Sequence, residues 1–282
     1  MMKVCLSEFL SKTQNLDLHR PSVVGTQSLG RALRLLQIVV TRPHQGWRIS
    51  DIAQKSELDI TTVHRLLTAL VQENLVEQRR SDKHYLPGSR LFELSLARSE
   101  QHEFQRDVEN ILRKFAQKCV GTLLFLVRSD TDFVCSMHLN LSGKVSTTML
   151  YPGARRSMIN SAGGIVILQN LPEPEFMRVL KDNLVREQVK NGQSRFGALQ
   201  QAFDVSNEYG FGVNLGFLVS GSHAFALVVS DASNEVYGSV CLIGAAEDYP
   251  ESSIMQTRDF LIPIRDELQS ALQNRVFSVL GE

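Results

Sequence analysis

The chain has 282 residues, of which 43% are hydrophobic, and its formal net charge at pH 7 is zero. This length predicts two domains, and the apolar content is enough for ordinary buried cores. No run of about 18 apolar residues occurs, so we expect no membrane span. The N-terminal segment MMKVCLSEFLSKTQ does not read as a signal peptide. Together these features favour a protein of the cytoplasm.

Charge is distributed unevenly along the chain. Residues 1–100 carry 14 Lys and Arg against 10 Asp and Glu, whereas residues 101–282 carry 16 against 20. A basic N-terminal part joined to an acidic remainder is typical of a nucleic-acid-binding domain attached to a second module.

Residues 1–25 are polar without sustained periodicity, and we expect them to form a flexible N-terminal arm. The pattern is helical from Ser28 to Leu70. Three- and four-residue steps place apolar side chains on one face of the first helix, namely Leu29, Ala32, Leu33, Leu36 and Val40. The sequence RPHQG at residues 42–46 then breaks this helix. A short helix ending at Lys55 is expected next, with Ser50 as its N-cap.

Three small or apolar residues have the spacing of a helix-turn-helix. Ala53 allows a second helix to approach closely, and Val63 and Leu66 of that second helix point inward. The second helix is expected to begin near Asp59. The turn carries Glu57 where many such turns have glycine, and a longer turn would relax the need for a positive φ there. Polar residues are predicted on the outward face of the second helix, namely Thr61, Thr62, His64, Arg65 and Thr68.

Two short strands are predicted directly after this helix. Residues 75–79 and 84–86 flank the polar sequence RSDK, which predicts a two-stranded wing with a basic tip. Basic side chains on a wing bind phosphates, and side chains of the second helix reach base edges in the major groove. A solvated charged hairpin remains the alternative. The predicted DNA contacts are Ser50, Thr61, Thr62, His64, Arg65, Thr68, Arg79, Arg80 and Lys83.

Residues 88–119 are again predicted to be helical. One short apolar stripe consists of Leu91, Leu94 and Ala97, and a second consists of Phe104, Val108, Ile111, Leu112 and Phe115. The polar sequence SEQH at residues 99–102 separates the stripes and is expected to connect two domains.

From Gly121 onward the chain reads as mixed helix and strand. Strands are predicted at residues 122–128, 133–139, 145–150, 224–230 and 236–243. Helices are predicted at residues 162–168, 174–180 and 198–208, and a long helix is predicted after Pro250. Strands that follow one another beside flanking helices predict an α+β domain.

Three segments carry a resemblance to a known family. They are SLGRALRLLQ, ISDIAQKSELDITTVHRLLTALVQENLVE and YLPGSRLFELS, and with them the chain resembles the IclR family of bacterial transcriptional regulators. The resemblance implies an α+β protein with a winged helix-turn-helix at residues 26–88, a linker helix at 89–104 and a GAF-like effector-binding domain at 105–282. It also implies binding to operator DNA, a small-molecule effector, often an organic acid or aromatic metabolite, and a homodimer or dimer-based tetramer.

The resemblance is weaker in the second domain. The run GARRSMINSAGG at residues 153–164 matches a family segment in which positions equivalent to Ala162 and Gly163 lie in the effector pocket. Backbone N–H groups at the start of a helix there suit an anionic ligand, and a glycine-rich turn needed only for tight packing is the alternative. The resemblance implies effector contacts at Met158, Ser161, Ala162, Gly163, Asn214, Ser222, Ala224, Ser239 and Cys241.

Several polar positions of that family pocket are changed in this sequence. The acidic residues expected in the segment 214–217 are missing, the usual cysteine is Ala224, and the lysine after the second glycine is Ile165. These changes favour a more apolar or aromatic effector. They also leave open a second domain that only oligomerises and binds no effector.

An enzyme with the winged helix as a protein-interaction module is a further alternative. The sequence holds no G-x-S-x-G, no P-loop and no dinucleotide-binding glycine motif. Its four cysteines and seven histidines are dispersed without metal-ligand spacing. We therefore expect no catalytic residues, no metal site and no cofactor.

Overall fold

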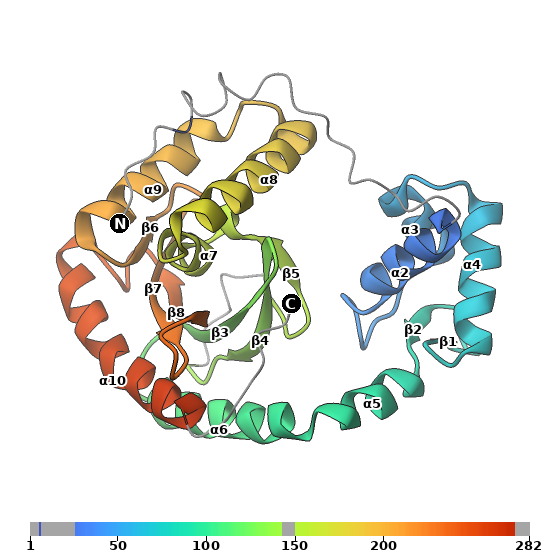
Figure 1. The fold of residues 1–282 in the computed structure, drawn as a ribbon, viewed down its shortest axis with the longest axis horizontal. Helices are drawn as coiled ribbons and strands as arrows, with labels where there is room; N and C mark the ends of the chain where they lie inside the picture. Colours follow the sequence, from blue (N-terminus) through green and yellow to red (C-terminus); the bar gives the residue numbers. More distant parts are fainter. Residues whose placement is uncertain (1–5, 7–25, 143–149, 274–282) are drawn as a thin grey trace. The chain divides into compact units, whose positions relative to one another are not determined.

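The computed structural model describes Leu6, residues 26–142 and residues 150–273. The chain divides into two compact units that meet between His102 and Glu103. This division lies within the polar sequence that we expected to connect two domains, although that sequence is helical in the structure. The ribbon is coloured along the chain, from blue at α2 to red at α10 (Figure 1).

The N-terminal unit has the element order of a winged helix-turn-helix. Its elements are α2 (Gln27–Val39), α3 (Ile49–Ser56), α4 (Ile60–Gln72), β1 (Val76–Gln78), β2 (Tyr85–Pro87), α5 (Ser89–Ser95) and the 3₁₀ helix η1 (Leu96–Arg98). The two strands pair antiparallel, and Trp47 adds an isolated bridge to Tyr85. The predicted helix-turn-helix and wing are therefore present.

One cluster of apolar side chains holds this unit together. It consists of Leu35, Ile38, Val39, Trp47, Ile52, Val63, Leu66, Leu67, Leu70, Val76 and Tyr85. The inward positions predicted for Val63 and Leu66 are confirmed. The stripe predicted for α2 is wrong about which residues are buried, because Leu29 and Leu33 are 60% and 47% exposed and the buried residues of α2 are Leu35, Ile38 and Val39. Ala32 and Leu36 are only partly buried against the cluster. α2 carries apolar residues on more of its circumference than α3 and α4 cover.

The helix start predicted at Ser50 is wrong by two residues. Helix α3 begins at Ile49 and its N-cap position is Arg48, so Ser50 lies in the first turn. The Ser50 hydroxyl group is exposed and hydrogen-bonds to the Asp51 carboxylate at 3.2 Å instead of capping the helix.

The C-terminal unit contains mixed helices and strands. Helix α6 (Ser99–Ala116) leads into it, followed by β3 (Thr122–Ser129), β4 (Asp132–Leu139), β5 (Arg155–Ser157), η2 (Met158–Asn160), α7 (Ala162–Gln169), α8 (Glu173–Asn191), α9 (Phe196–Tyr209), β6 (Gly212–Leu215), β7 (Ser222–Ser230), β8 (Val236–Ala245), η3 (Glu251–Ser253) and α10 (Ile254–Gln273). The α+β class predicted from the sequence is confirmed.

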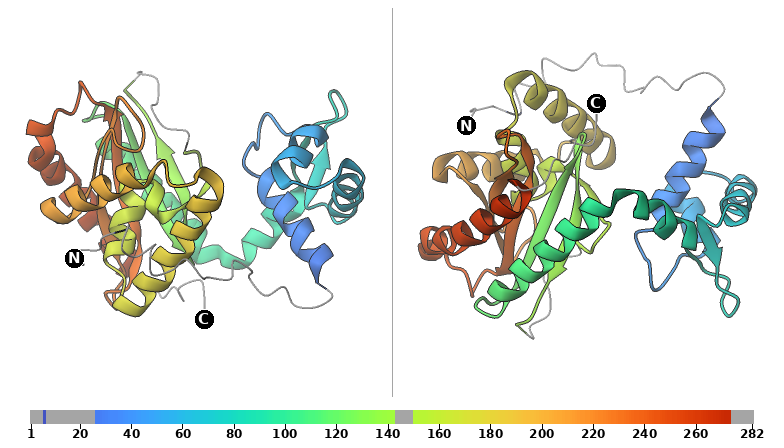
Figure 2. Two further views of the ribbon diagram at one scale, coloured as in Figure 1. Left: turned by 90° about the horizontal axis from the view of Figure 1, so that it is seen from above. Right: turned by 60° about the horizontal axis from the view of Figure 1, so that its bottom comes forward.

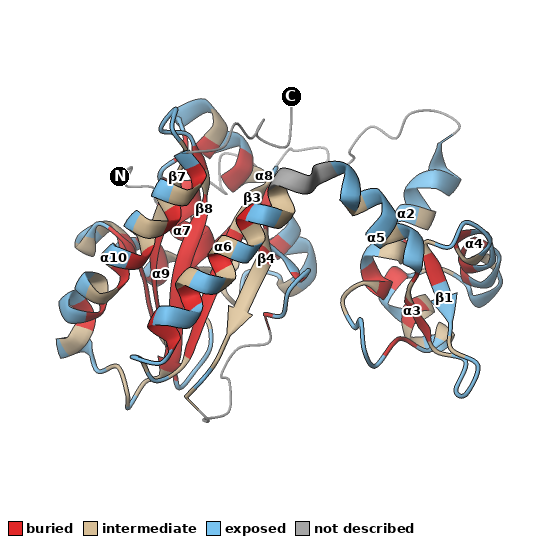
Figure 3. Ribbon diagram, turned by 90° about the horizontal axis from the view of Figure 1, so that it is seen from below, coloured by how far each residue is buried: buried red, intermediate tan, exposed pale blue. Residues whose placement is uncertain are grey.

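Six antiparallel strands form one sheet in the order β5-β4-β3-β8-β7-β6. Helices α7, α8 and α9 cover one face, and α6 and α10 cover the other (Figures 1 and 2). Side chains alternate between these faces: Leu124 and Leu126 of β3 point to the first layer, whereas Leu123 and Phe125 point to the second. Both faces of the central strands are therefore buried (Figure 3).

The apolar stripes predicted at residues 88–119 differ in their burial. In α6, Phe104, Val108, Leu112 and Phe115 are buried against the sheet, as the spacing predicts. In α5, Leu94 is 58% exposed, so the first stripe is not part of a core.

Two short strands, β5 and β6, were not predicted, because three or four residues are too few to show an alternating pattern. The strand predicted at residues 145–150 falls on residues outside the described range, apart from Leu150. The predicted N-terminal arm also lies outside it, except Leu6. The Leu6 side chain is buried in the C-terminal unit, and its N–H donates to Gln200 Oε1 at 2.7 Å.

Candidate DNA-binding surface and ligand cavity

The second helix of the helix-turn-helix begins where the sequence predicts. Asp59 is its N-cap, and one carboxylate oxygen accepts the N–H of Thr62 at 2.8 Å. This hydrogen bond holds the pKa of Asp59 below its ordinary value, because it stabilises the ionised carboxylate. The cap therefore fixes the first turn of α4, which carries several of the predicted DNA contacts.

The outward face of α4 is polar and open. Thr61, His64, Arg65 and Thr68 are exposed, whereas Thr62 is half-buried beside its cap. Of these side chains, the Thr68 hydroxyl group is bound within the helix, where it donates to the His64 carbonyl oxygen at 2.8 Å. The structure thus brings four of the five predicted α4 contacts to one exposed face.

The turn between α3 and α4 requires a left-handed residue. Glu57 has φ 57° and ψ 31°, a conformation that non-glycine residues adopt at a cost. The expectation that a longer turn would relax this requirement is therefore wrong. The left-handed Glu57 ends α3 and directs the chain into the cap of α4.

The wing is held by a network around Arg79. Its guanidinium group donates to both carboxylate oxygens of Asp82, at 2.9 and 2.7 Å, and to the carbonyl oxygens of His44 and Gln45, at 3.0 and 2.8 Å. The hydrogen bonds from Arg79 hold the pKa of Asp82 well below its ordinary value. Because these contacts occupy the guanidinium group, Arg79 fixes the wing to the loop before α3.

The other two cationic side chains predicted for the wing are exposed to solvent. Arg80 and Lys83 are exposed at the tip, and Lys83 adopts a positive φ of 61° in the turn. The sequence could show that three cations lie in this hairpin. It could not show which one the fold uses for its own stability.

A cavity of about 210 Å³ lies between the sheet and the start of α7. Its walls come from strands β3 to β8, from η2 and α7, and from the segments before β5 and after β6. The lining residues are Leu124, Leu126, Phe133, Leu150, Arg156, Asn160, Ser161, Ala162, Gly163, Asn214, Leu218, Val219, Ser222, Ala224, Cys241 and Ile243. Most of this lining is apolar, and none of it is acidic.

Several hydrogen-bond donors belong to the cavity lining. Ser161 caps α7, since its hydroxyl oxygen accepts the Gly164 N–H at 2.9 Å. No partner among the described residues takes the N–H groups of Ala162 and Gly163. Asn214 is 4% exposed, and its Oδ1 accepts the Leu218 N–H, which leaves its amide nitrogen without a partner in the same part of the chain. These donors suit an acceptor on a bound ligand.

Close packing explains both glycines of α7. A Cβ atom on Gly163 would lie 2.3 Å from the Cys241 sulfur, and a Cβ atom on Gly164 would lie 2.1 Å from the Met158 carbonyl oxygen. Gly163 also lines the cavity. The packing and ligand-pocket interpretations of this sequence therefore both fit the structure at Gly163.

Seven of the nine predicted effector contacts line the cavity, namely Ser161, Ala162, Gly163, Asn214, Ser222, Ala224 and Cys241. Met158 and Ser239 do not. Met158 is fully buried behind Gly164, and the Ser239 hydroxyl group donates to the Gly163 carbonyl oxygen at 3.1 Å. Burial raises the pKa of the Cys241 thiol to about 12, so this wall is neutral at physiological pH.

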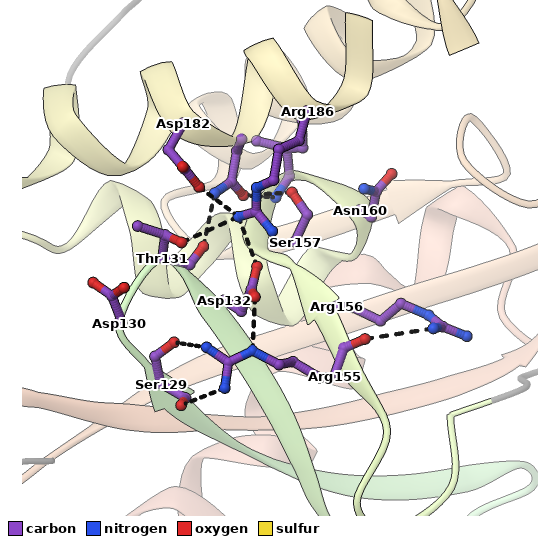
Figure 4. A network of polar contacts seen from close by, with 12 residues as sticks. Ser129, Asp130, Thr131, Asp132, Arg155, Arg156, Ser157, Asn160, Asp182 and Arg186 are labelled. Carbon is purple, nitrogen blue, oxygen red and sulfur yellow. Dashed lines mark hydrogen bonds and ion pairs between the residues drawn. The ribbon is translucent and has the colours of Figure 1, made fainter. Parts of the chain in front are cut away.

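Sequence reasoning missed Arg156 and Asn160. Both come from the segment of β5 and η2, which a polar network holds against α8 (Figure 4). Asp132, with a side chain 11% exposed, accepts hydrogen bonds from Arg155 Nε at 2.7 Å and from Arg186 Nη2 at 2.8 Å. Asn183 accepts from the Ser157 hydroxyl group at 2.6 Å and donates to the Thr131 carbonyl oxygen at 2.7 Å.

The described residues contain neither a metal-like cluster nor a membrane-spanning helix. No three His, Cys, Asp or Glu side chains converge as metal ligands in that part of the chain. Within the same ranges, every helix is too short or too polar to cross a bilayer.

Comparison with protein families identifies the N-terminal unit. Residues 28–80 match the model of the IclR helix-turn-helix domain. The transcriptional repressor IclR of Escherichia coli is 24% identical over 168 residues, which is 57% of this chain and 58% of that protein. The match thus spans less than two thirds of that relative. The probable transcriptional regulator SauR of Cupriavidus necator is 24% identical over 65% of this chain and 72% of its own.

Solved structures share the fold of both units. An IclR family transcriptional regulator from Brucella abortus is similar with a TM-score of 0.65 at 19% identity, covering 91% of this chain and 95% of that one. An IclR homolog from Microbacterium hydrocarbonoxydans, complexed with 4-hydroxybenzoate, has a TM-score of 0.65 at 16% identity and covers 88% of this chain and all of that one. Residues 28–80 thus form an IclR-type helix-turn-helix domain, and the chain as a whole shares the fold of these IclR-family structures.

Proposed function

We propose that this protein is a DNA-binding transcriptional regulator that acts in the cytoplasm and responds to a small organic acid. The observation that carries the proposal is the face of α4. Asp59 caps this helix, and Thr61, His64 and Arg65 are exposed along its first turns. Hydroxyl, imidazole and guanidinium groups on one open helix face suit base edges and phosphates in a major groove.

The wing supplies phosphate contacts in this proposal. Arg80 and Lys83 are exposed at its tip and bind the DNA backbone beside the groove. Arg79 instead holds the wing to the carbonyl oxygens of His44 and Gln45. Ser50, in the exposed first turn of α3, donates to a phosphate. Such contacts set position and affinity, and the α4 contacts set sequence preference.

The active form is a homodimer or a dimer-based tetramer. Large apolar side chains are exposed in the N-terminal unit, namely Leu29, Leu33, Phe92, Leu94 and Leu96. An isolated apolar residue on a surface needs no explanation, but five in α2, α5 and η1 fit contacts with a second copy. Two copies related by symmetry would read two half-sites of a pseudo-palindrome.

The cavity of the C-terminal unit is the effector site. An apolar cavity of about 150 Å³ is large enough for benzene, so one of about 210 Å³ fits a small ring or a short chain with a polar end. Unpaired donors and the lack of acidic lining residues favour a carboxylate as that end. The structural neighbour complexed with 4-hydroxybenzoate supports this ligand class. The effector changes DNA binding because its affinity differs between two arrangements of the DNA-binding units.

Fluorescence anisotropy tests the DNA-binding function. The purified protein is titrated onto labelled DNA from the intergenic region beside its gene, and onto scrambled DNA of equal length at the same salt concentration. We expect tight binding that prefers the native sequence. Equal and weak binding to both DNAs, and to fragments selected from the whole genome, would contradict the proposal.

A C-terminal unit that only oligomerises is a second candidate, favoured by the missing acidic positions around Asn214. Thermal unfolding in the presence of a panel of organic acids and aromatic compounds separates the two candidates. A ligand that binds the native state must raise the apparent stability. A flat response to the whole panel, with DNA binding intact, would favour the oligomerisation role.

A further inference from the structure

Two neighbouring arginines of β5 have opposite surroundings. Strand β5 pairs with β4 so that Arg156 lies opposite Phe133 and Arg155 lies opposite Val134. Successive side chains of a strand point to opposite faces. Arg156 and Phe133 both line the cavity, whereas Arg155 does not. The two arginine side chains extend in different directions from β5 (Figure 4).

The two guanidinium groups also differ in their partners. Arg155 donates to the Asp132 carboxylate at 2.7 Å and to the hydroxyl and carbonyl oxygens of Ser129, both at 2.9 Å. Arg156 makes one contact, from Nη1 to the Arg155 carbonyl oxygen at 3.4 Å. Among the described residues no carboxylate pairs with Arg156. Its remaining donors can therefore form a two-pronged contact with a ligand carboxylate.

The backbone on both sides of Arg156 is fixed. Arg155 is held by Asp132, which also accepts from Arg186 of α8, and the Ser157 hydroxyl group donates to Asn183 of the same helix. The Asp132 side chain is only 11% exposed, so solvent weakens its two ion pairs less than it weakens a pair that is exposed on both sides. Arg156 is thus an exposed cation at the mouth of an apolar cavity, carried on a strand that cannot easily turn away.

We propose that Arg156 binds the carboxylate of the effector and makes the site select anions over neutral molecules of the same shape. Arg155 is a positioning residue that holds β5 in the register that points Arg156 to the cavity. The Asn214 amide nitrogen and the N–H groups of Ala162 and Gly163 complete the set of donors. This inference rests on the proposed effector function of the cavity.

Pairs of ligands that differ only in charge test the proposal. Calorimetric titration compares benzoate with benzamide, 4-hydroxybenzoate with 4-hydroxybenzamide, and hexanoate with hexanamide. We expect the wild-type protein to prefer the acid of at least one pair roughly 10- to 100-fold, as a charge-assisted contact allows. Arg156→Gln should bring that ratio close to one by weakening only the acid, and Arg156→Lys should keep part of the preference.

Arg178→Gln is the matched control. Arg178 is an arginine of α8 that pairs with Asp130 and Glu175 and does not line the cavity, so the ratio should stay at the wild-type value. An unchanged ratio in Arg156→Gln, or equal wild-type affinities within every pair, would overturn the role of Arg156 and leave the effector site standing. If the wild-type protein binds none of the six compounds, both this proposal and the effector assignment fail, while the anisotropy result for DNA is unaffected.

Discussion

The proposed DNA-binding surface comes from one continuous stretch, residues 50–83, whereas the cavity is lined by segments scattered between Leu124 and Ile243. On the DNA-binding surface, the polar side chains of α4 recur with the helical repeat and therefore lie on one face of the helix. At the cavity, a side chain reaches the site only if the strand that carries it pairs in the observed register. A local surface depends on periodicity, and a composite cavity depends on topology. The two units should therefore respond differently to substitutions.

The largest expected effect is the loss of the DNA-binding unit when its small core is opened. Leu67 is fully buried in a cluster of eleven side chains. Leu67→Ala should destabilise this unit by about 2–5 kcal/mol, because it removes buried methyl groups and leaves a cavity. Trp47, the only tryptophan of the chain, is buried in the same cluster, so its fluorescence during urea unfolding reports on this unit.

Leu268→Ala provides the comparison. Leu268 is equally buried, but it lies on α10 of the C-terminal unit. We expect its loss to leave the Trp47 transition in place while the helical circular dichroism unfolds earlier. If Trp47 fluorescence and circular dichroism shifted together in both variants, the two units would unfold as one and would not be independent in stability.

A second prediction concerns the helix that borders the cavity. Gly164→Ala would bring a Cβ atom within 2.1 Å of the Met158 carbonyl oxygen, a backbone atom that cannot move alone. Overpacking of this kind costs about 1–3 kcal/mol, so the C-terminal unit should unfold earlier in urea. Gly197→Ala is the control: no atom lies within 4 Å of its Cβ position in α9, and alanine there should be neutral or stabilising by up to about 1 kcal/mol. Equal effects of the two substitutions would contradict the packing argument.

The N-terminal unit could be predicted from sequence because its signals are local. The Asp59 cap, the inward Val63 and the exposed Arg65 all follow from positions within one helix. The prediction was less accurate where the sequence is compatible with burial of either of two helix faces. Helix α2 has apolar residues on two faces, and only packing against α3 and α4 decides that Leu35 is buried and Leu29 is not.

The cavity shows the opposite situation. Positions near the start of α7 could be carried over from the family resemblance, because Ser161 and the two glycines have a local signature. Arg156 could not be found, since β5 has three residues and shows no alternation of its own. Its direction depends on pairing with Phe133, which lies more than 20 positions earlier in the chain. A strand pairing between residues so far apart in the chain cannot be predicted from a short stretch of sequence.

A third prediction separates base contacts from phosphate contacts on the DNA-binding surface. Arg65→Ala should weaken specific binding by about 1–3 kcal/mol and relax sequence preference at one position, if its guanidinium group reads a base. Arg80→Ala, at the wing tip, should weaken binding to all sequences alike and reduce the salt dependence of affinity by about one counterion. Anisotropy titrations at several salt concentrations measure both quantities. A uniform loss in Arg65→Ala, with a shallower salt dependence, would assign Arg65 to a phosphate instead.

The smallest expected effect lies in the turn between α3 and α4, where the chain departs from the usual glycine. Glu57 adopts φ 57° and is exposed, so its side chain contributes little packing. A left-handed conformation costs a non-glycine residue about 1–2 kcal/mol, and glycine loses about 0.5–1 kcal/mol of that advantage through its more flexible unfolded state. Glu57→Gly should therefore stabilise the N-terminal unit by about 0.5–1 kcal/mol, measured by Trp47 fluorescence in urea.

Asn74 is the matched site for this change, because it has φ 56° in the same unit. Asparagine tolerates the left-handed region better than glutamate does, so Asn74→Gly should stabilise the unit less than Glu57→Gly. The DNA affinity of Glu57→Gly should stay at the wild-type value, since the glycine preserves the observed turn and the cap of α4. A destabilised Glu57→Gly protein would mean that the carboxylate of Glu57 stabilises the turn by more than its backbone strain costs. The glutamate would then have a structural role in the turn that neither its spacing nor its exposure predicts.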